Sequence, residues 1–167
     1  LENKGTYELP EAVLDRFMFK VVMEYPKRDE ELMIIGSNNT TSPERKRGVK
    51  AVCNKEKILE MQMATRKVFL SDRIKEYILN IVEATRGINK KIEGIKFVKY
   101  GAGPRATIAL AIGSRAQALM EGRNYVLPSD VNAVSKSILR HRVSLNFKGK
   151  AYGISADKIV EEILTKV

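Results

Sequence analysis

The chain has 167 residues, of which 44% are hydrophobic, and this is enough to bury the core of one ordinary domain. Lysine and arginine number 30 against 20 acidic residues, so the formal charge is +10 and an anionic partner is worth testing. A single cysteine and a single histidine exclude an internal disulfide and any metal site built from several such ligands. No stretch reaches the roughly eighteen apolar residues of a membrane span, and no basic-then-apolar signal peptide opens the chain, so we expect a cytoplasmic protein without a membrane partner.

The first 25 residues predict the end of a larger structure. Pro10–Leu14 suits one or two helical turns, and Phe17–Tyr25 alternates as a β-strand does. A single strand leaves its backbone N–H and C=O groups unpaired, so it needs partners from another chain or from sequence outside this one. Because the chain also begins at Leu1 instead of a methionine, we expect it to be a piece of a longer protein.

Residues 26–53 predict a connection. A short helix is expected over about Lys27–Ile35 with its end at Gly36, and Ser37–Lys50 is polar and turn-forming. The run Arg45–Lys50 is basic, which would suit a nucleic-acid backbone. Because no aromatic residues interleave its cations, the pattern favours a solvated loop, and nucleic acid is not an expected partner.

Residues 54–167 predict a bundle of helices. Asn54, Ser71 and Ser155 are good helix N-caps. Pro104 and Pro128 suit the first position of a helix. The clearest apolar series at helical spacing is Ile74, Tyr77, Ile78, Ile81 and Val82. The predicted fold class is therefore mainly α, a helical bundle that follows a short remnant made of a helical turn and one strand.

Cys53 and His141 belong to the residue types that most often carry nucleophilic or metal chemistry. Cys53 has no partner cysteine and precedes a helix cap, so we expect it to pack without reacting. His141 lies near the end of a predicted helix, between two arginines, where the helix dipole favours cations. A structural role is therefore expected for His141 instead of metal binding, and no metal ligands are predicted.

The commonest self-sufficient catalytic signatures, G-x-x-x-x-G-K-[ST], H-E-x-x-H and G-x-S-x-G, are absent from the sequence. Four other segments carry more information: Gly5–Phe17 (G-T-Y-E-L-P-E-A-V-L-D-R-F), Gly101–Ala106 (G-A-G-P-R-A), Glu121–Val131 (E-G-R-N-Y-V-L-P-S-D-V) and Leu139–Val143 (L-R-H-R-V). In this order they resemble the MoxR family of AAA+ ATPases, whose core closes on G-T-Y-x-L-P-E-A-x-x-D-R-F and whose lid has a helix that begins with G-A-x-P-R-A. The chain departs from the commoner family residues at Glu8, Val13, Gly103 and Leu127.

The resemblance implies three parts. Residues 1–25 would be the C-terminal end of the α/β ATPase core, residues 26–53 a connection with a short helix and a basic loop, and residues 54–167 the helical lid domain. Walker A, Walker B and the first sensor would lie outside the chain. The parent protein would bind ATP with Mg²⁺ and hydrolyse it in a ring, most simply a hexamer, as a chaperone-like remodelling or complex-maturation factor that works with a von Willebrand A domain partner. The chain alone would bind neither ATP nor Mg²⁺ and would be inactive.

Arg16 matches the arginine finger of that family, which reaches the γ-phosphate of ATP bound to the neighbouring subunit. A guanidinium suits this role because it presents fixed donors to the charge that develops on the transferred phosphoryl group. From the residues alone, an ion pair between Asp15 and Arg16 at the entrance of the strand explains the pattern as well.

Arg105 matches sensor 2, the lid arginine that reads the nucleotide of its own subunit. Pro104 at the first helical position, preceded by Gly103, leaves free N–H groups and the positive end of the helix dipole beside Arg105, which suits a phosphate. The alternative is an exposed arginine in the first turn of a helix, a place that the dipole slightly disfavours. If both assignments hold, Arg105 couples the lid to the nucleotide and Arg16 couples one subunit to the next.

Two other functions stay open at this point. The charge of +10 would also suit a basic helical module that binds nucleic acid. A lid with degenerate upstream motifs would bind proteins without hydrolysing ATP.

Overall fold

A computed structural model describes residues 9–38, 50–88 and 91–167 of the chain. Within these residues the elements follow in the order α1 (Glu11–Leu14), α2 (Arg28–Asn38), α3 (Lys55–Lys67), α4 (Asp72–Thr85), η2 (Glu93–Phe97), β1 (Val98–Tyr100), α5 (Pro104–Met120), α6 (Pro128–Leu139), β2 (Ser144–Leu145), α7 (Phe147–Ala151) and α8 (Ala156–Lys166). The prediction of a mainly helical chain is confirmed, and in the described part no helix is long and apolar enough to cross a membrane.

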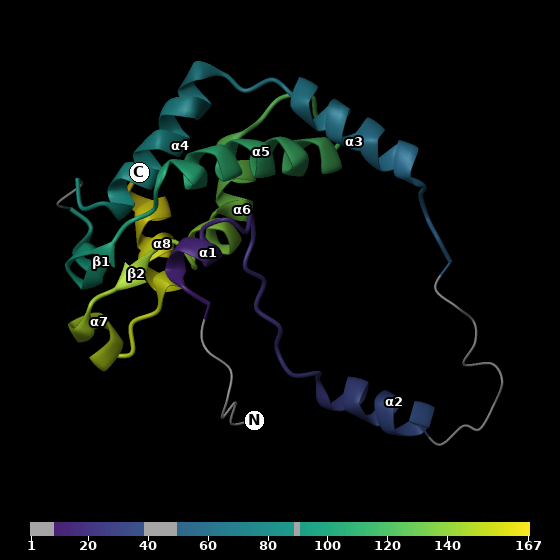
Figure 1. Cartoon of the computed structure of the whole chain (residues 1–167), viewed down its shortest axis with the longest axis horizontal. Helices are drawn as coiled ribbons and strands as arrows, with labels where there is room; N and C mark the ends of the chain where they lie inside the picture. Colours follow the sequence, from purple (N-terminus) through teal and green to yellow (C-terminus); the bar gives the residue numbers. More distant parts are fainter. Residues whose placement is uncertain (1–8, 39–49, 89–90) are drawn as a thin grey trace.

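Helices α4, α5, α6 and α8 enclose the core of the protein (Figure 1). Helix α5 packs along α6, and α4 and α8 close the bundle. The largest side chains that are fully buried between them include Ile78, Ile81, Leu110, Ile138, Leu139, Ile159 and Ile163. Burial of one face of each amphipathic helix is the main force that stabilises such a bundle.

The ends of the helices follow the predicted capping residues. The side-chain oxygens of Asn54, Ser71 and Ser155 each accept a hydrogen bond from the backbone N–H three residues later, at 2.9 to 3.3 Å. Helices α4 and α5 are followed by Gly87 and Gly122, whose φ angles of 84° and 73° are costly for residues with a side chain. These caps are local signals, which is why the sequence predicted the boundaries closely.

A small antiparallel sheet was not predicted. Strand β1 pairs with β2, with Val98 opposite Leu145 and Tyr100 opposite Ser144, and the short helix α7 follows directly. Strands of two and three residues are too short to show an alternating pattern, so they cannot be predicted from hydrophobic periodicity. The sheet lies at one end of the bundle, beside α1 (Figure 1).

The predicted strand Phe17–Tyr25 is wrong. These residues form no strand in the structure, and the backbone of this segment is held to the bundle by the N–H of Lys20, which donates to the carbonyl of Ser137 at 2.8 Å. The distal apolar side chains stay exposed, with Met23 at 87% and Tyr25 at 89%. A strand needs a neighbouring strand for its ladder, and the described residues offer none to this segment.

The connection differs from expectation in three ways. Helix α2 continues through Gly36 to Asn38, and it lies apart from the bundle (Figure 1). Cys53 is exposed, so the prediction that it packs is wrong. The apolar side of α3 is about half exposed, although α3 packs against α5. Of the basic run Arg45–Lys50, all but Lys50 lies outside the described residues, and the division at residues 25 and 53 stays a prediction.

Candidate functional site

The loop that leads into α5 is fixed to the C-terminal end of α4. The backbone N–H of Ala102 donates to the buried Thr85 Oγ1 at 2.9 Å, and Arg86 Nε donates to the Ala102 carbonyl at 2.9 Å. Gly101 lies so close to α4 that a Cβ atom there would stand 2.4 Å from the Thr85 carbonyl oxygen. The loop therefore requires glycine at this position, and its fixed course determines where α5 begins.

Arg105 is the second residue of α5. Gly103 is the N-cap and brings no side chain to cap the helix, and Pro104 stands at the first helical position, as predicted. The Arg105 side chain is 55% exposed, and its Nη1 donates to Asp15 Oδ2 at 3.0 Å. Arg105 is thus exposed in the first turn of its helix, as the alternative interpretation has it, and it also forms an ion pair with the segment that carries Arg16.

Arg142 binds the same carboxylate from the other side. Its side chain is only 3% exposed, and its Nε donates to Asp15 Oδ1 at 3.0 Å. Asp15 thus lies between two guanidinium groups. Its partial burial by itself would raise the pKa of the Asp15 carboxyl, but the hydrogen bonds from Arg105 and Arg142 hold that pKa below its ordinary value. The carboxylate is accordingly charged at neutral pH.

Arg16 follows directly after Asp15 and is exposed. Its backbone N–H donates to the Val13 carbonyl at 3.1 Å, and its side chain makes no hydrogen bond or ion pair with any residue that the structure describes. The ion pair between Asp15 and Arg16, our alternative explanation, is not formed, because Asp15 is engaged by Arg105 and Arg142. The finger and sensor assignments of Arg16 and Arg105 themselves stay predictions.

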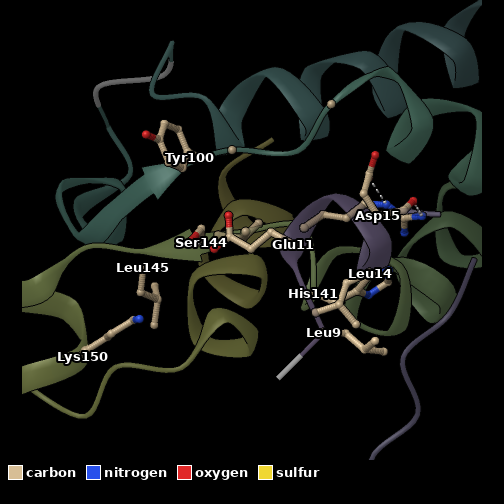
Figure 2. Close-up of a pocket in the computed structure, with 13 residues that line it drawn as sticks. Leu9, Glu11, Leu14, Asp15, Tyr100, His141, Ser144, Leu145 and Lys150 are labelled. Carbon is tan, nitrogen blue, oxygen red and sulfur yellow. Dashed lines mark hydrogen bonds and ion pairs between the residues drawn. The ribbon is translucent and has the colours of Figure 1, made fainter. Parts of the chain in front are cut away.

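A hollow of about 450 Å³ opens beside these residues, between α1, the loop before α5 and the segment after α6 (Figure 2). Asp15 and Glu11 reach it from the first segment, Tyr100 from the sheet, and Lys150 from α7. Ser144 Oγ donates to Glu11 Oε1 at 2.6 Å across the hollow and so joins α1 to the sheet. Charged groups of both signs line the space.

His141 also lines this hollow and has a structural contact. Its Nε2 lies 3.0 Å from the Phe17 carbonyl, to which it donates, and its Nδ1 is buried with no hydrogen-bond partner in the described part of the chain. Burial lowers the pKa of His141, because a protonated ring would place a second N–H at a position without an acceptor. The neutral ring acts here as a hydrogen-bond donor to the backbone.

The sequence alone did not reveal the roles of Asp15 and Arg142. Leu139–Val143 stood out as a motif, but its arginines were explained by the helix dipole. Arg142 stands just after a predicted helix, where exposed and bound arginines have the same local pattern. Its partners, about 125 residues away in the chain, gave no sequence signal.

Several known proteins and one protein family are similar to this chain. The family of AAA lid domains matches residues 96–163. The uncharacterized protein YeaC of Bacillus subtilis is 38% identical over the whole chain, which covers 49% of YeaC. The chaperone MoxR1 of Mycobacterium tuberculosis is 34% identical over the whole chain, which covers 44% of MoxR1. The crystal structure of a candidate ATPase from Cytophaga hutchinsonii superposes with a TM-score of 0.87 at 37% identity, over the whole chain and 51% of that protein.

The chain thus spans about half the length of the curated relatives it matches. Both sequence relatives and the crystal structure match it from end to end, including the segment before the lid match. The chain therefore carries an AAA lid domain and is similar over its whole length to MoxR-type AAA+ proteins.

Proposed function

We propose that the protein to which this chain belongs hydrolyses ATP in a ring, and that this chain contributes two arginines to the nucleotide sites. Arg16 would act in trans on the nucleotide of a neighbouring subunit, and Arg105 would sense the nucleotide of its own subunit. The observation that carries the proposal is the ion pair between Arg105 and Asp15, which joins the lid to the residue next to Arg16. The chain lacks a P-loop sequence, so we expect it to bind no ATP and no Mg²⁺ by itself.

Arg16 has the properties that a finger needs. Its side chain is exposed and free of ion pairs with the described residues, so it can approach an anion on another molecule without breaking an existing bond. The transferred phosphoryl group spreads negative charge over its oxygens in the transition state, and a guanidinium stabilises this charge without a proton transfer. Such a contact forms only when a neighbouring subunit is present.

Arg105 has the properties of a sensor. It stands in the first turn of a 17-residue helix whose N-cap supplies no side-chain acceptor, so the positive end of the helix dipole lies beside it. Its present partner, Asp15, is a carboxylate that a phosphate of higher charge can replace. Exchange of Asp15 for phosphate would change the lid contacts when nucleotide binds.

The function of the whole protein follows from its relatives and is proposed on that basis. One relative is named a chaperone, and we propose a chaperone-like role in remodelling or maturing protein complexes. We further propose a hexameric ring in the cytoplasm, with ATP and Mg²⁺ as ligands and a von Willebrand A domain protein as partner.

Mixed rings of the full-length protein test both arginines. We expect Arg16→Ala to lower turnover about 1,000-fold while leaving nucleotide binding intact, since an arginine finger contributes roughly this much. Subunits with a disabled P-loop but an intact Arg16 should restore turnover when mixed with Arg16→Ala subunits. If rings form and the mixture stays inactive, Arg16 is not a finger.

Arg105→Ala is expected to weaken nucleotide binding in its own subunit, measured with a fluorescent ATP analogue. Unchanged binding and turnover would remove its sensor role. Restoration by mixing would instead assign Arg105 to the neighbour's nucleotide. A wild-type protein that neither binds nor hydrolyses ATP would leave the protein-interaction lid as its function.

A further inference from the structure

Arg142 holds the segment that carries Arg16 through an unusually complete set of hydrogen bonds. Its Nε donates to Asp15 Oδ1, its Nη2 to the carbonyls of Asp15 and Phe17 at 3.0 and 2.6 Å, and its Nη1 to the carbonyls of Met18 and Ile138 at 3.2 and 2.6 Å. All five N–H donors of the guanidinium are therefore used. A buried cation is tolerated only when its donors are satisfied in this way, so the position requires an arginine.

The acceptors of Arg142 surround one residue. The carbonyl groups of Asp15 and Phe17 belong to the two neighbours of Arg16 in the chain, and both are fixed by the same Nη2 atom. The Arg16 side chain itself is left exposed by this arrangement. Arg142 thus fixes the backbone on both sides of Arg16 and does not occupy its guanidinium.

Further bonds from the same stretch of the lid support this attachment. His141 Nε2 donates to the Phe17 carbonyl at 3.0 Å, Arg140 Nη1 donates to the Lys20 carbonyl at 3.3 Å, and the Lys20 N–H donates to the Ser137 carbonyl at 2.8 Å. These partners all belong to the end of α6 and the residues just after it. The segment from Asp15 to Lys20 is therefore attached to one end of one lid helix.

We propose that Arg142 is the positioning residue for Arg16, and that it makes the finger segment move together with the end of α6. This inference rests on the proposed function of Arg16. A movement of the lid in one subunit would then displace Arg16 at the nucleotide site of the next subunit. Because all five of its donors are used, Arg142 has none left for a nucleotide, and it acts through the Asp15 carboxylate and the carbonyls of residues 15, 17 and 18.

The test uses Arg142→Lys in the full-length protein. Lysine keeps the charge but has three donors on one atom and cannot reach the separate acceptors of the guanidinium. We expect about a 100-fold loss of turnover from a misplaced Arg16, with binding of a fluorescent ATP analogue and ring assembly unchanged. Arg123→Lys is the matched control, because Arg123 also binds a buried carboxylate within the lid but makes none of its hydrogen bonds with the finger segment. It should retain turnover within about twofold.

Mixed rings separate positioning from a general loss of structure. If Arg142 acts through Arg16, subunits with a disabled P-loop and an intact Arg142 should restore turnover at the active sites of Arg142→Lys subunits. A lid that is merely damaged would impair its own subunit and would not be restored. His141→Phe, which removes one hydrogen bond to the Phe17 carbonyl, should show the same pattern with a smaller loss, and it serves if Arg142→Lys does not fold.

Hydrogen exchange gives a readout that does not depend on turnover. The Lys20 N–H donates to the Ser137 carbonyl, and this bond should open more often when Arg142 no longer holds the segment. The rate of amide exchange at Lys20 should therefore rise in Arg142→Lys and stay the same in Arg123→Lys. Two results would overturn this inference alone: an exchange rate at Lys20 in Arg142→Lys equal to that of the wild type, or no restoration of Arg142→Lys in mixed rings in which Arg16→Ala is restored. If Arg16→Ala is itself not restored in mixed rings, the proposed function fails and the positioning role falls with it.

Discussion

Replacing Gly101 by alanine tests how the loop before α5 is held. A Cβ atom at residue 101 would lie 2.4 Å from the Thr85 carbonyl oxygen, 2.6 Å from the Thr85 carbonyl carbon and 2.8 Å from the Arg86 nitrogen. All three are backbone atoms at the end of α4, so no side chain can rotate away to relieve the clash. The loop and the helix end must separate by about 1 Å to reach ordinary contact distance.

The size of the effect follows from what this separation breaks. The hydrogen bonds from Ala102 to Thr85 and from Arg86 to Ala102 join the same two segments, and each contributes about 1 kcal/mol. Forced overpacking adds about 1 to 3 kcal/mol. We therefore expect Gly101→Ala to lower the free energy of unfolding by about 3 kcal/mol, which is a shift of about 1.5 M in the urea midpoint.

Gly103→Ala is the matched control. Gly103 has φ −85° and ψ −177°, which any residue adopts, and a Cβ there meets nothing within 4 Å. The poorer N-cap and the less flexible unfolded chain offset each other, so the change should stay within about 0.5 kcal/mol. Urea unfolding followed by circular dichroism measures both variants. Equal losses in the two, or a loss below about 0.5 kcal/mol for Gly101→Ala, would refute the close approach of this loop to α4.

Three further predictions concern the lid itself. Asp130→Ala should lower the free energy of unfolding by about 3 kcal/mol, because this carboxylate is 3% exposed and accepts three hydrogen bonds. Asp157→Ala, at a carboxylate that is 37% exposed, should lower it by less than about 1 kcal/mol, and similar urea midpoints for the two variants would contradict this. Ile81→Ala should lower the free energy of unfolding by about 3 kcal/mol and Leu79→Ala by less than about 1 kcal/mol, because Ile81 is fully buried and Leu79, on the same helix, is 43% exposed. Thermal unfolding of the two variants checks this difference. Because the pKa of His141 is lowered in the folded protein, the unfolded chain takes up a proton more readily, so stability is full above the ordinary pKa of 6.5 and falls as the pH drops below it towards the folded-state pKa. His141→Phe should remove this pH dependence from urea midpoints measured from about pH 5 to 8. An identical pH dependence in the variant would exclude the histidine as its source.

The bundle was predictable because its signals are local. Ser71 and Ser155 cap helices through hydrogen bonds that span three residues, and the apolar positions of α4 and α8 recur with the helical period. At the N-terminus of α6 the N-cap Leu127 has no capping side chain, and the carboxylate of Asp130, three residues later, accepts a hydrogen bond from the Leu127 N–H at 2.8 Å.

The segment Phe17–Tyr25 was not predictable from its own residues. Its β-branched and aromatic composition describes how it packs on a pleated surface, and such propensity depends on the neighbouring strands. In the described part of the chain no strand lies beside it, and its first four residues are held to the bundle by hydrogen bonds and by packing of Met18 against the core. The site was missed for a related reason. Arg142 and Asp15 are 127 residues apart, and an arginine at a helix end has the same local pattern whether it is exposed or bound.

The two arginines bound to Asp15 differ in a way that decides which of them can change partner. Arg105 is 55% exposed and holds Asp15 through one ion pair, of a kind that contributes little in water. Arg142 is 3% exposed and is bound by four further backbone carbonyl contacts, so releasing it would leave a buried charge unsatisfied. If Arg105 is the sensor proposed above, a phosphate can therefore remove it from Asp15 while Arg142 stays in place. The sensor would change partner, and the finger segment would keep its attachment to the lid.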